Sequence, residues 1–236
     1  MRDAAFADAR ATARYVIQNL RKVYGKPKPF PKLDPLDVLI ETILSQSTTN
    51  VNSQRTFEQL KARFPDWEQA RRARVTSIET AIRSGGLARQ KSKRIKELLN
   101  EIHKRRGSLD LSFLARAPLE KAKEFLGSFK GIGPKTAACT LLFACRRPVF
   151  PIDVHIFRIA RRLGWLPDRG SDEEAHRVME GIVPREQYFE VHINLIRHGR
   201  TICRPQKPLC QQCCLLDYCE YANHISQESF RPCSFA

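Results

Sequence analysis

A lysine that directly follows a glycine turn is the side chain best placed for covalent chemistry in this sequence. Residues 131–135 read Gly-Ile-Gly-Pro-Lys and separate two segments with helical patterns. Glycines let the backbone turn and approach another molecule closely, and proline suits the first position of the second helix. Unpaired N–H groups at such a helix start favour an anion. Lys135 could therefore act as a nucleophile that forms a Schiff base, or only as a cation that binds a phosphate.

A carboxylate stands before the next helical pattern. Residues 150–164 read FPIDVHIFRIARRLG and place Asp153 immediately ahead of an apolar periodicity. Aspartate is a good N-cap, because its carboxylate accepts hydrogen bonds from the first helical N–H groups. An ionised carboxylate close to Lys135 could also stabilise positive charge on a sugar ring or accept the proton of the amine. The sequence leaves open whether the two groups meet.

Four of the eight cysteines are spaced Cys-x6-Cys-x2-Cys-x5-Cys. They are Cys203, Cys210, Cys213 and Cys219. Zinc sites usually pair their ligands as two Cys-x2-Cys units, whereas this segment contains one such unit with long flanking gaps. A loop that wraps a four-iron cluster fits the spacing better. Four unliganded thiols are the alternative, but clustered thiols in a reducing compartment favour metal binding.

The charge of the chain favours a polyanionic partner. Its 236 residues include 41 Lys and Arg against 25 Asp and Glu, which gives a formal net charge of +16. Nucleic acid is the first candidate, and an anionic membrane surface is the second. No stretch approaches 18 apolar residues and no basic amphipathic segment has a Trp/Phe-rich face, so we expect no membrane partner. The start of the chain lacks an apolar h-region, so we expect no secretory signal.

A basic loop surrounds the first two clustered cysteines. Arg200, Arg204 and Lys207 lie in a stretch from Val191 to Leu216 that contains no acidic residue. Such a loop suits the phosphate backbone of a nucleic acid.

Nearly every segment predicts a helix, so the expected fold class is all-α. No run alternates in the manner of a strand for more than four residues. The predicted helices cover residues 5–24, 36–45, about 48–64, 75–83, 88–106, 118–126, 134–144, 153–163, 172–181 and 186–197. The two helices around the glycine turn form either a helix–hairpin–helix that holds a DNA phosphate without reading a base, or a plain helical hairpin.

Three motifs in this order resemble endonuclease III, the iron–sulfur branch of the helix–hairpin–helix DNA glycosylases. They are GIGPKTA at 131–137, IDVHIFR at 152–158, and the cysteine spacing. The similarity extends from about residue 8 to residue 221. It implies two domains with the active site in the cleft between them: a six-helix bundle at 28–146, with the hairpin at about 119–146, and a domain of residues 1–27 with 147–236 that carries a [4Fe-4S] loop at 203–219.

The resemblance also implies an activity. Its members act in base excision repair as bifunctional DNA glycosylases and abasic-site lyases that remove oxidised pyrimidines from duplex DNA. Lys135 matches the family's catalytic lysine, which attacks the sugar C1′, forms a Schiff base and cuts the strand by β-elimination, and Asp153 matches its catalytic aspartate. The implied partner is duplex DNA with damaged bases or abasic sites, bound by a monomer. We expect a cytoplasmic, nucleoid-associated protein of a prokaryote.

The family pattern extends to residues that would contact DNA. Leu87 aligns with a residue that wedges into the opposite strand, and His155 falls in the site without an assigned chemical role. The family's gap-filling glutamine falls near Gln46, but an ungapped alignment places Ser47 there. The expected DNA contacts are Gln46, Ser47, Leu87, Lys130, Gly131, Ile132, Gly133, Thr136, His155, Arg200, Arg204 and Lys207.

Departures from the family pattern occur at two places. The family hairpin commonly reads Leu-Pro-Gly-Val-Gly, whereas residues 129–133 read Phe-Lys-Gly-Ile-Gly. The tail after Tyr221 has no clear family counterpart, and we expect packing or disorder at Phe230 and Cys233.

Two other functions remain as alternatives. A monofunctional glycosylase of the same superfamily would remove thymine, uracil or adenine from mispairs, but such relatives usually lack the lysine, so Lys135 argues against this reading. A non-catalytic, cluster-stabilised DNA-binding protein would need neither Lys135 nor Asp153.

Overall fold

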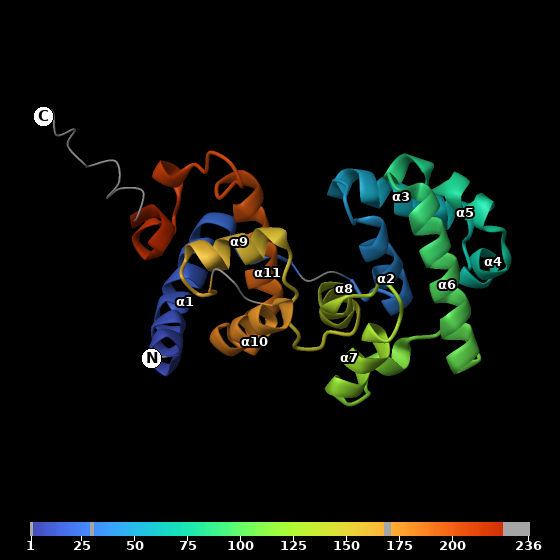
Figure 1. Ribbon diagram of the computed structural model, residues 1–236, viewed down its shortest axis with the longest axis horizontal. Helices are drawn as coiled ribbons and strands as arrows, with labels where there is room; N and C mark the ends of the chain where they lie inside the picture. The colour runs from blue at the N-terminus through green and yellow to red at the C-terminus, as the bar shows by residue number, and fades with distance from the viewer. Residues whose placement is uncertain (1, 29–30, 168–170, 224–236) are drawn as a thin grey trace, which may run out of the picture. The chain divides into compact units, whose positions relative to one another are not determined.

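The structure is a computed structural model that describes residues 2–28, 31–167 and 171–223 (Figure 1). Every regular element among these residues is helical and none is a strand, so the all-α prediction is confirmed. The chain forms two compact units. The central unit comprises residues 30–147, and the terminal unit combines residues 1–29 with residues 148–236.

The central unit is built around an apolar helix, α2 (Pro35–Leu44), whose Leu39, Ile40 and Ile43 are fully buried. Asp34 caps it by accepting hydrogen bonds from the backbone N–H groups of residues 36 and 37 at 2.8 and 3.1 Å. This cap and the proline at the first helical position fix where the helix begins. The other helices of the unit are α3 (Asn50–Arg63), α4 (Trp67–Arg72), α5 (Val75–Ala81), α6 (Ala88–Arg106), α7 (Leu119–Gly127) and α8 (Pro134–Cys139). Helix α8 continues into a π-helical turn at Thr140–Ala144.

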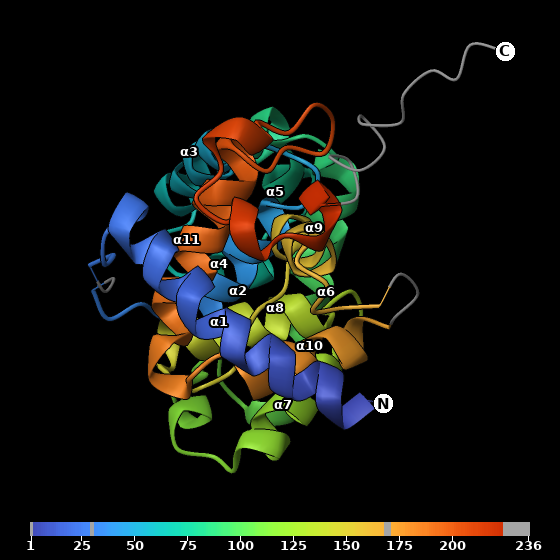
Figure 2. The same ribbon diagram turned by 90° about the vertical axis from the view of Figure 1, so that its left-hand side faces the viewer.

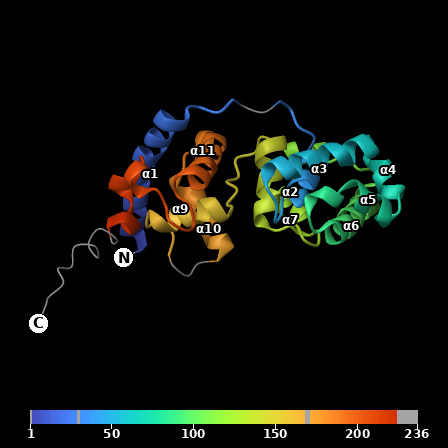
Figure 3. The ribbon, with the colours of Figure 1, turned by 90° about the horizontal axis from the view of Figure 1, so that it is seen from above.

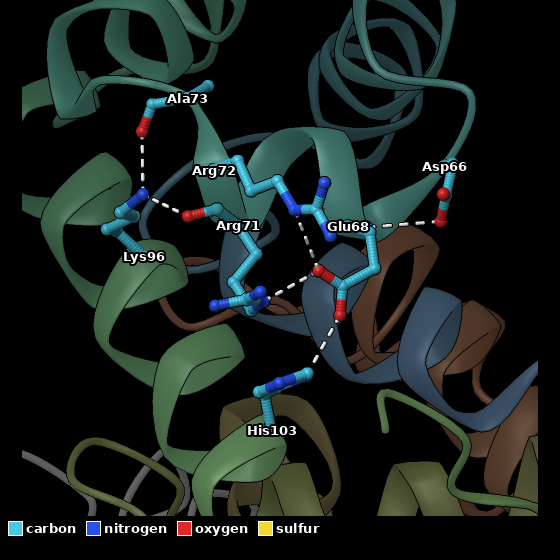
Figure 4. Close-up of polar contacts among 7 residues, drawn as sticks. All are labelled: Asp66, Glu68, Arg71, Arg72, Ala73, Lys96 and His103. Atoms are coloured by element: carbon cyan, nitrogen blue, oxygen red, sulfur yellow. Dashed lines mark hydrogen bonds and ion pairs between the residues drawn. The ribbon is translucent and has the colours of Figure 1, made fainter. Parts of the chain in front are cut away.

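Helix α4 is held to α6 by polar contacts (Figure 4). Lys96 of α6 donates hydrogen bonds to the carbonyl oxygens of Arg71 and Ala73, the latter at 2.7 Å, and so caps the carboxyl end of α4. Glu68 of α4 accepts a hydrogen bond from Arg71 at 2.7 Å and lies 2.9 Å from His103 Nδ1 of α6. These contacts anchor the middle and the carboxyl end of α6, because Lys96 and His103 are two turns apart.

Helix α4 is an element that the periodicity does not predict. The helix is only six residues long, too short to show an apolar repeat. Its ends are satisfied locally by Asp66, which accepts from the Glu68 N–H at 3.1 Å, and from a distance by Lys96. Because Lys96 is more than 20 residues away along the chain, a local sequence window cannot detect it.

The terminal unit joins the two ends of the described chain (Figures 2 and 3). It contains α1 (Arg2–Tyr24), α9 (Val154–Arg162), α10 (Asp172–Ile182) and α11 (Tyr188–Thr201). Helix α1 packs against α10 and α11, and α11 packs against α9. Arg21 of α1 donates two hydrogen bonds to the carboxylate of Glu190 on α11, at 2.5 and 2.8 Å. A two-pronged pair of this kind sets the register of the two helices, because both N–H groups must face both oxygens.

Gly85 makes a close contact that gives a stability prediction. A Cβ at Gly85 would lie 2.7 Å from Cγ2 and 2.8 Å from Oγ1 of the buried Thr56. We therefore expect Gly85→Ala to lower the free energy of unfolding by about 1–3 kcal/mol, since added atoms in a packed site force neighbours to shift. Thermal and denaturant unfolding measure the change. Adding Thr56→Ala should recover part of the loss, because it removes both clashing atoms.

Gly127 provides the matched control for this prediction. It ends α7, and a Cβ there would meet nothing within 4 Å. Gly127→Ala should therefore leave stability unchanged or raise it by up to about 1 kcal/mol. If both substitutions change the free energy of unfolding equally, the contact with Thr56 does not destabilise the Gly85→Ala protein.

Within residues 2–28, 31–167 and 171–223, the structure contains no helix with the length and apolar character needed to cross a membrane.

Candidate active site and cysteine loop

The hairpin before Lys135 is a tight turn between α7 and α8 with a packed base. The Ile132 N–H donates to the carbonyl oxygen of Phe129 at 3.1 Å, which closes the turn. Both side chains are buried, with exposed fractions of 5% and 3%. Ile132 therefore anchors the loop with its side chain, and only the backbone of that residue is left for contact with another molecule. Arg105 of α6 covers the Phe129 ring at 4.7 Å.

The two hairpin glycines have different conformations. Gly131 has a φ of +81°, in the left-handed region that favours glycine. Gly133 has a φ of −88°, which any residue adopts, and a Cβ there would meet nothing within 4 Å. Only Gly131 is therefore required by the turn itself, and the surroundings of Gly133 are open to a partner.

Lys135 lies in the first turn of α8 and is half-buried. Within the part of the chain that the structure describes, no hydrogen bond or ion pair engages its amine. The nearby Lys130 is exposed, whereas Thr136 is 4% exposed. A contact of Thr136 with DNA thus stays a prediction that would need its backbone rather than its side chain.

Leu87 is presented to solvent by an unusual backbone. It has a φ of +51° and follows Gly86, whose φ is +70°. A left-handed conformation costs a leucine roughly 1–2 kcal/mol, and strain of this kind concentrates at functional positions. The side chain is 55% exposed although it is large and apolar. These features suit a residue that packs against another molecule.

Gln46 and Ser47 lie in the loop between α2 and α3, and the structure treats them differently. Ser47 is exposed and has a φ of +55°. Gln46 is half-buried, and its Oε1 accepts a hydrogen bond from Arg94 Nη1 at 2.6 Å. The side chain of Gln46 is thus held in place, whereas that of Ser47 faces solvent.

Asp153 caps α9 in the terminal unit. One carboxylate oxygen, Oδ1, accepts hydrogen bonds from the N–H groups of His155 and Ile156, each at 2.9 Å. The predicted N-cap is therefore confirmed. Among the described residues, Oδ2 has no hydrogen-bond partner. Burial lowers the pKa of His155; the Asp153 carboxylate opposes this shift, and the nearby Arg158 and Arg200 add to it.

Two arginines of α9 bind the cysteine loop to the helix that Asp153 begins. Arg158 donates to the carbonyl oxygen of Cys203 through Nε and Nη2, at 3.0 and 2.8 Å. Arg162 donates to Cys203 Sγ at 3.1 Å and to the carbonyl oxygen of Arg204 at 2.8 Å. The Cys219 thiol donates to the Arg162 carbonyl oxygen at 3.3 Å. Helix α9 therefore supports both the carboxylate and the loop.

The four clustered cysteines line one small cavity of about 20 Å³ that is partly open to solvent. The other lining groups include Arg162 and apolar side chains such as Ile202 and Leu216. Cys214, the neighbour of Cys213 in the sequence, is absent from the lining. Four thiols around one cavity, with a cation beside one of them, are a suitable donor set for an anionic iron–sulfur cluster.

A single metal ion suits this cavity less well. Among the described residues, no group of three or more His, Cys, Asp or Glu side chains is gathered closely enough to hold a metal ion. One zinc ion needs all of its sulfur ligands at about 2.3 Å. A four-iron cluster accepts more widely spaced thiolates, because each cysteine binds a different iron.

A buried histidine lies against one of these cysteines. His198 of α11 is 1% exposed, and its Nε2 lies 3.4 Å from Cys213 Sγ. Burial lowers the pKa of His198 to about 4 and raises the pKa of the Cys213 thiol to about 12. Tyr24 Oη lies 3.1 Å from the other ring nitrogen. A thiolate only accepts hydrogen bonds, so in a ligated site Nε2–H would donate to the sulfur and Nδ1 would accept from Tyr24.

The predicted basic loop is exposed. Arg200, Arg204 and Lys207 all face solvent, and Arg204 donates to the carbonyl oxygen of Thr201 at 3.0 Å. Phe230 and Cys233 lie outside the described residues.

Sequence reasoning missed Lys91, Arg94, Arg158 and His198 as structural partners of the site. Two of them could have been found from the sequence. Lys91 stands four residues before Ile95 and His198 three residues after Leu195, so each lies on the apolar face of its helix. A polar residue at a buried position must find partners, so its position on the stripe predicts an internal contact. Arg94 and Arg158 lack such a signal.

Comparison with known proteins gives one family match. Residues 40–185 match the family described as HhH-GPD superfamily base excision DNA repair protein. The match covers most of the central unit and the α9–α10 part of the terminal unit.

Curated relatives and solved structures agree with this match. An Arabidopsis thaliana protein named provisionally as a DNA glycosylase is 43% identical over 168 residues, which is 71% of this chain and 57% of that protein. This chain thus spans just over half the length of that relative. An endonuclease III of Thermotoga maritima is 30% identical over 83% of this chain and 87% of its own length. A solved non-covalent endonuclease III–DNA complex has a TM-score of 0.79 at 24% identity and covers 92% of this chain and 98% of the solved chain.

Proposed function

Because this chain belongs to the HhH-GPD superfamily of base excision DNA repair proteins, within its endonuclease III family, we propose that it is a bifunctional DNA glycosylase and abasic-site lyase. Its substrate is an oxidised pyrimidine in duplex DNA, or an abasic site. The protein acts as a monomer, and the net charge of +16 supports its attraction to the phosphate backbone. A cytoplasmic, nucleoid-associated location in a prokaryote is part of the proposal.

The observation that carries the proposal is the amine of Lys135 at the start of α8, which has no hydrogen-bond or ion-pair partner among the residues that the structure describes. In its neutral form the amine bonds to the sugar C1′ as the base departs with the bonding electrons and gains a proton. Loss of the amine proton and opening of the sugar ring give an iminium. Removal of a C2′ proton then expels the 3′ phosphate, and water releases the lysine. A monofunctional glycosylase needs no such amine.

Asp153 is a suitable second group for the same chemistry. Its Oδ1 is occupied by the helix cap, which leaves Oδ2 to accept the amine proton or to face positive charge on the sugar. The hairpin backbone around Gly131 and Gly133 would hold a phosphate without reading sequence. A damaged, weakly stacked base is the least costly to extrude from the duplex.

The cysteine loop completes the proposal. Cys203, Cys210, Cys213 and Cys219 would hold a [4Fe-4S] cluster. When bound, the cluster would supply a rigid, covalently linked frame for residues 203–219.

Asp153 gives a prediction that separates capping from catalysis. Asparagine caps helices as well as aspartate does, so Asp153→Asn should keep the melting temperature and lower base excision by about 10²–10⁴-fold. Asp153→Ala should lose about 1 kcal/mol of stability as well, because two backbone N–H groups lose their acceptor. Single-turnover excision and thermal unfolding measure the two effects. Full excision by Asp153→Asn would remove the carboxylate from the mechanism.

Borohydride trapping tests the proposed function. The substrates are a duplex with one thymine glycol, a matched abasic duplex and an undamaged duplex. Borohydride reduces the iminium to a stable amine, so we expect a covalent adduct on the first two duplexes and none on the third. DNA binding without any adduct would contradict the lyase and favour a monofunctional glycosylase, to be screened on mismatched duplexes.

A further inference from the structure

We propose that Arg94 is a positioning residue that joins Gln46 to the hairpin turn at Gly131, so that one side chain on α6 aligns two segments that meet DNA. The inference rests on the proposed function, since it concerns how the protein recognises a lesion. It assigns a role to a residue that neither the cysteine loop nor the lysine chemistry requires.

The first contact of Arg94 is with the loop between α2 and α3. Its Nη1 donates to Gln46 Oε1 at 2.6 Å, and both side chains are half-buried. A hydrogen bond from a charged donor is short and roughly twice as strong as a neutral one. Because Oε1 faces the guanidinium, the NH₂ group of Gln46 is turned away from it. Arg94 thereby fixes which end of the amide is available to a base.

The second contact is with the hairpin. A Cβ on Gly131 would lie 2.5 Å from Arg94 Nε and 2.9 Å from Cζ, so the guanidinium lies directly on the glycine backbone. Glycine suits this position for two reasons. A Cβ would collide with the Arg94 side chain, and the φ of +81° favours glycine. Gln46 and Gly131 are 85 residues apart in the sequence, and Arg94 touches both.

Lys91, one turn earlier on α6, fixes the backbone beside these segments. Its Nζ donates to the carbonyl oxygens of Leu44 at 2.7 Å and Gly85 at 3.0 Å. The residue is 3% exposed, and burial lowers the pKa of its ammonium. Leu44 ends α2 two residues before Gln46, and Gly85 stands two residues before Leu87. The first turns of α6 therefore hold three segments that the proposed function brings to DNA.

These turns are held on a fixed support. Lys96 and His103, farther along α6, bind it to α4 (Figure 4). Because these contacts hold α6 in place, a shift of the Arg94 guanidinium with either the Gln46 loop or the hairpin changes its contact with the other. Arg94 thus sets the distance between two segments that would meet DNA. The hairpin would hold a phosphate, and the Gln46 amide would enter the base stack.

A double-mutant cycle tests the proposal. Arg94→Gln, Gln46→Ala and the double variant are compared in single-turnover excision of thymine glycol and in the ratio of affinities for lesion and undamaged duplexes. We expect each single variant to lose discrimination by roughly tenfold, which corresponds to 1.4 kcal/mol. The double variant should lose no more than either single one, because each single change already breaks the link. Arg94→Lys, which keeps the charge and the aliphatic stem, should behave as Arg94→Gln does.

Lys93→Gln is the matched control. It removes the same unit charge from the neighbouring, exposed position on α6. It should weaken binding to both duplexes equally and leave the affinity ratio unchanged, since phosphate contacts carry no lesion information. Melting temperatures of all variants show whether folding contributes.

Three results would overturn the inference. Additive effects of Arg94→Gln and Gln46→Ala would show that the two residues act independently. If Arg94→Gln and Lys93→Gln have the same ratio of affinities for lesion and undamaged duplexes, Arg94 contributes only its positive charge. A wild-type protein that neither excises thymine glycol nor prefers the lesion duplex would overturn the proposed function together with this inference, and so is distinguishable from the first two.

Discussion

We expect that substitution of Lys135 by glutamine abolishes the borohydride-trapped adduct and the strand break, and that it lowers base release by at least about 10³-fold. Glutamine is close to lysine in length and remains polar, so the first turn of α8 is expected to stay folded. An amide nitrogen cannot form an iminium, so no covalent intermediate can be reduced. The variant should still bind abasic DNA, because the hairpin backbone and the basic surface are unchanged.

The measurement combines trapping, gel analysis of strand cleavage and a binding assay on an abasic duplex. Lys121→Gln is the control: this exposed lysine on α7 pairs with Glu124 at 2.9 Å and also loses one positive charge. It should retain the adduct. A Lys135→Gln protein that still cuts abasic DNA at the wild-type rate would move the nucleophile to another amine.

Replacement of Cys213 by serine is expected to remove most of the bound iron and to lower the melting temperature by about 10 °C. Structural metal sites contribute several kcal/mol to folding, and each kcal/mol shifts a chain of this size by about 2–4 °C. The Cys213 thiol lines the cavity beside His198, so its loss would remove a proposed ligand and the neighbour of His198 Nε2. Iron content, visible absorption and thermal unfolding report the effect.

Cys214→Ser provides a control at the adjacent position. Cys214 is half-buried, like Cys213, but does not line the cavity. Its replacement should leave iron content unchanged. If the two serine variants retain the same iron per chain, the four-cysteine ligand set is wrong.

Local patterns predicted most of the helices and the cap at Asp153, because apolar periodicity and N-cap chemistry act within a few residues. Helix α4 could not be predicted, since Lys96, far along the chain, completes its carboxyl end. Of the two hairpin glycines, only Gly131 has a positive φ. The presence of glycine does not by itself indicate a positive φ, because a position that must stay open for a partner also favours glycine.

The candidate site was predictable where chemistry depends on residue type and spacing. Four thiols in one loop line one cavity, and Lys135 stands at the expected helix start. The link from Arg94 to Gln46 and Gly131 was not predictable, because an arginine on a half-exposed helical face has many possible partners. Tertiary placement decides among them, and no local pattern encodes it.

The discontinuous terminal unit has a consequence for the order of events during synthesis. All residues of the central unit leave the ribosome before α11, so this unit can fold as soon as residue 147 emerges. Helix α1 emerges before the central unit but must wait for α10 and α11, with the face of Ala13, Val16 and Leu20 uncovered in the meantime. Helix α1 is therefore made before the central unit but becomes stable after it. A nascent chain halted before Tyr188 would contain a folded central unit and an α1 helix whose apolar face is exposed and prone to aggregate.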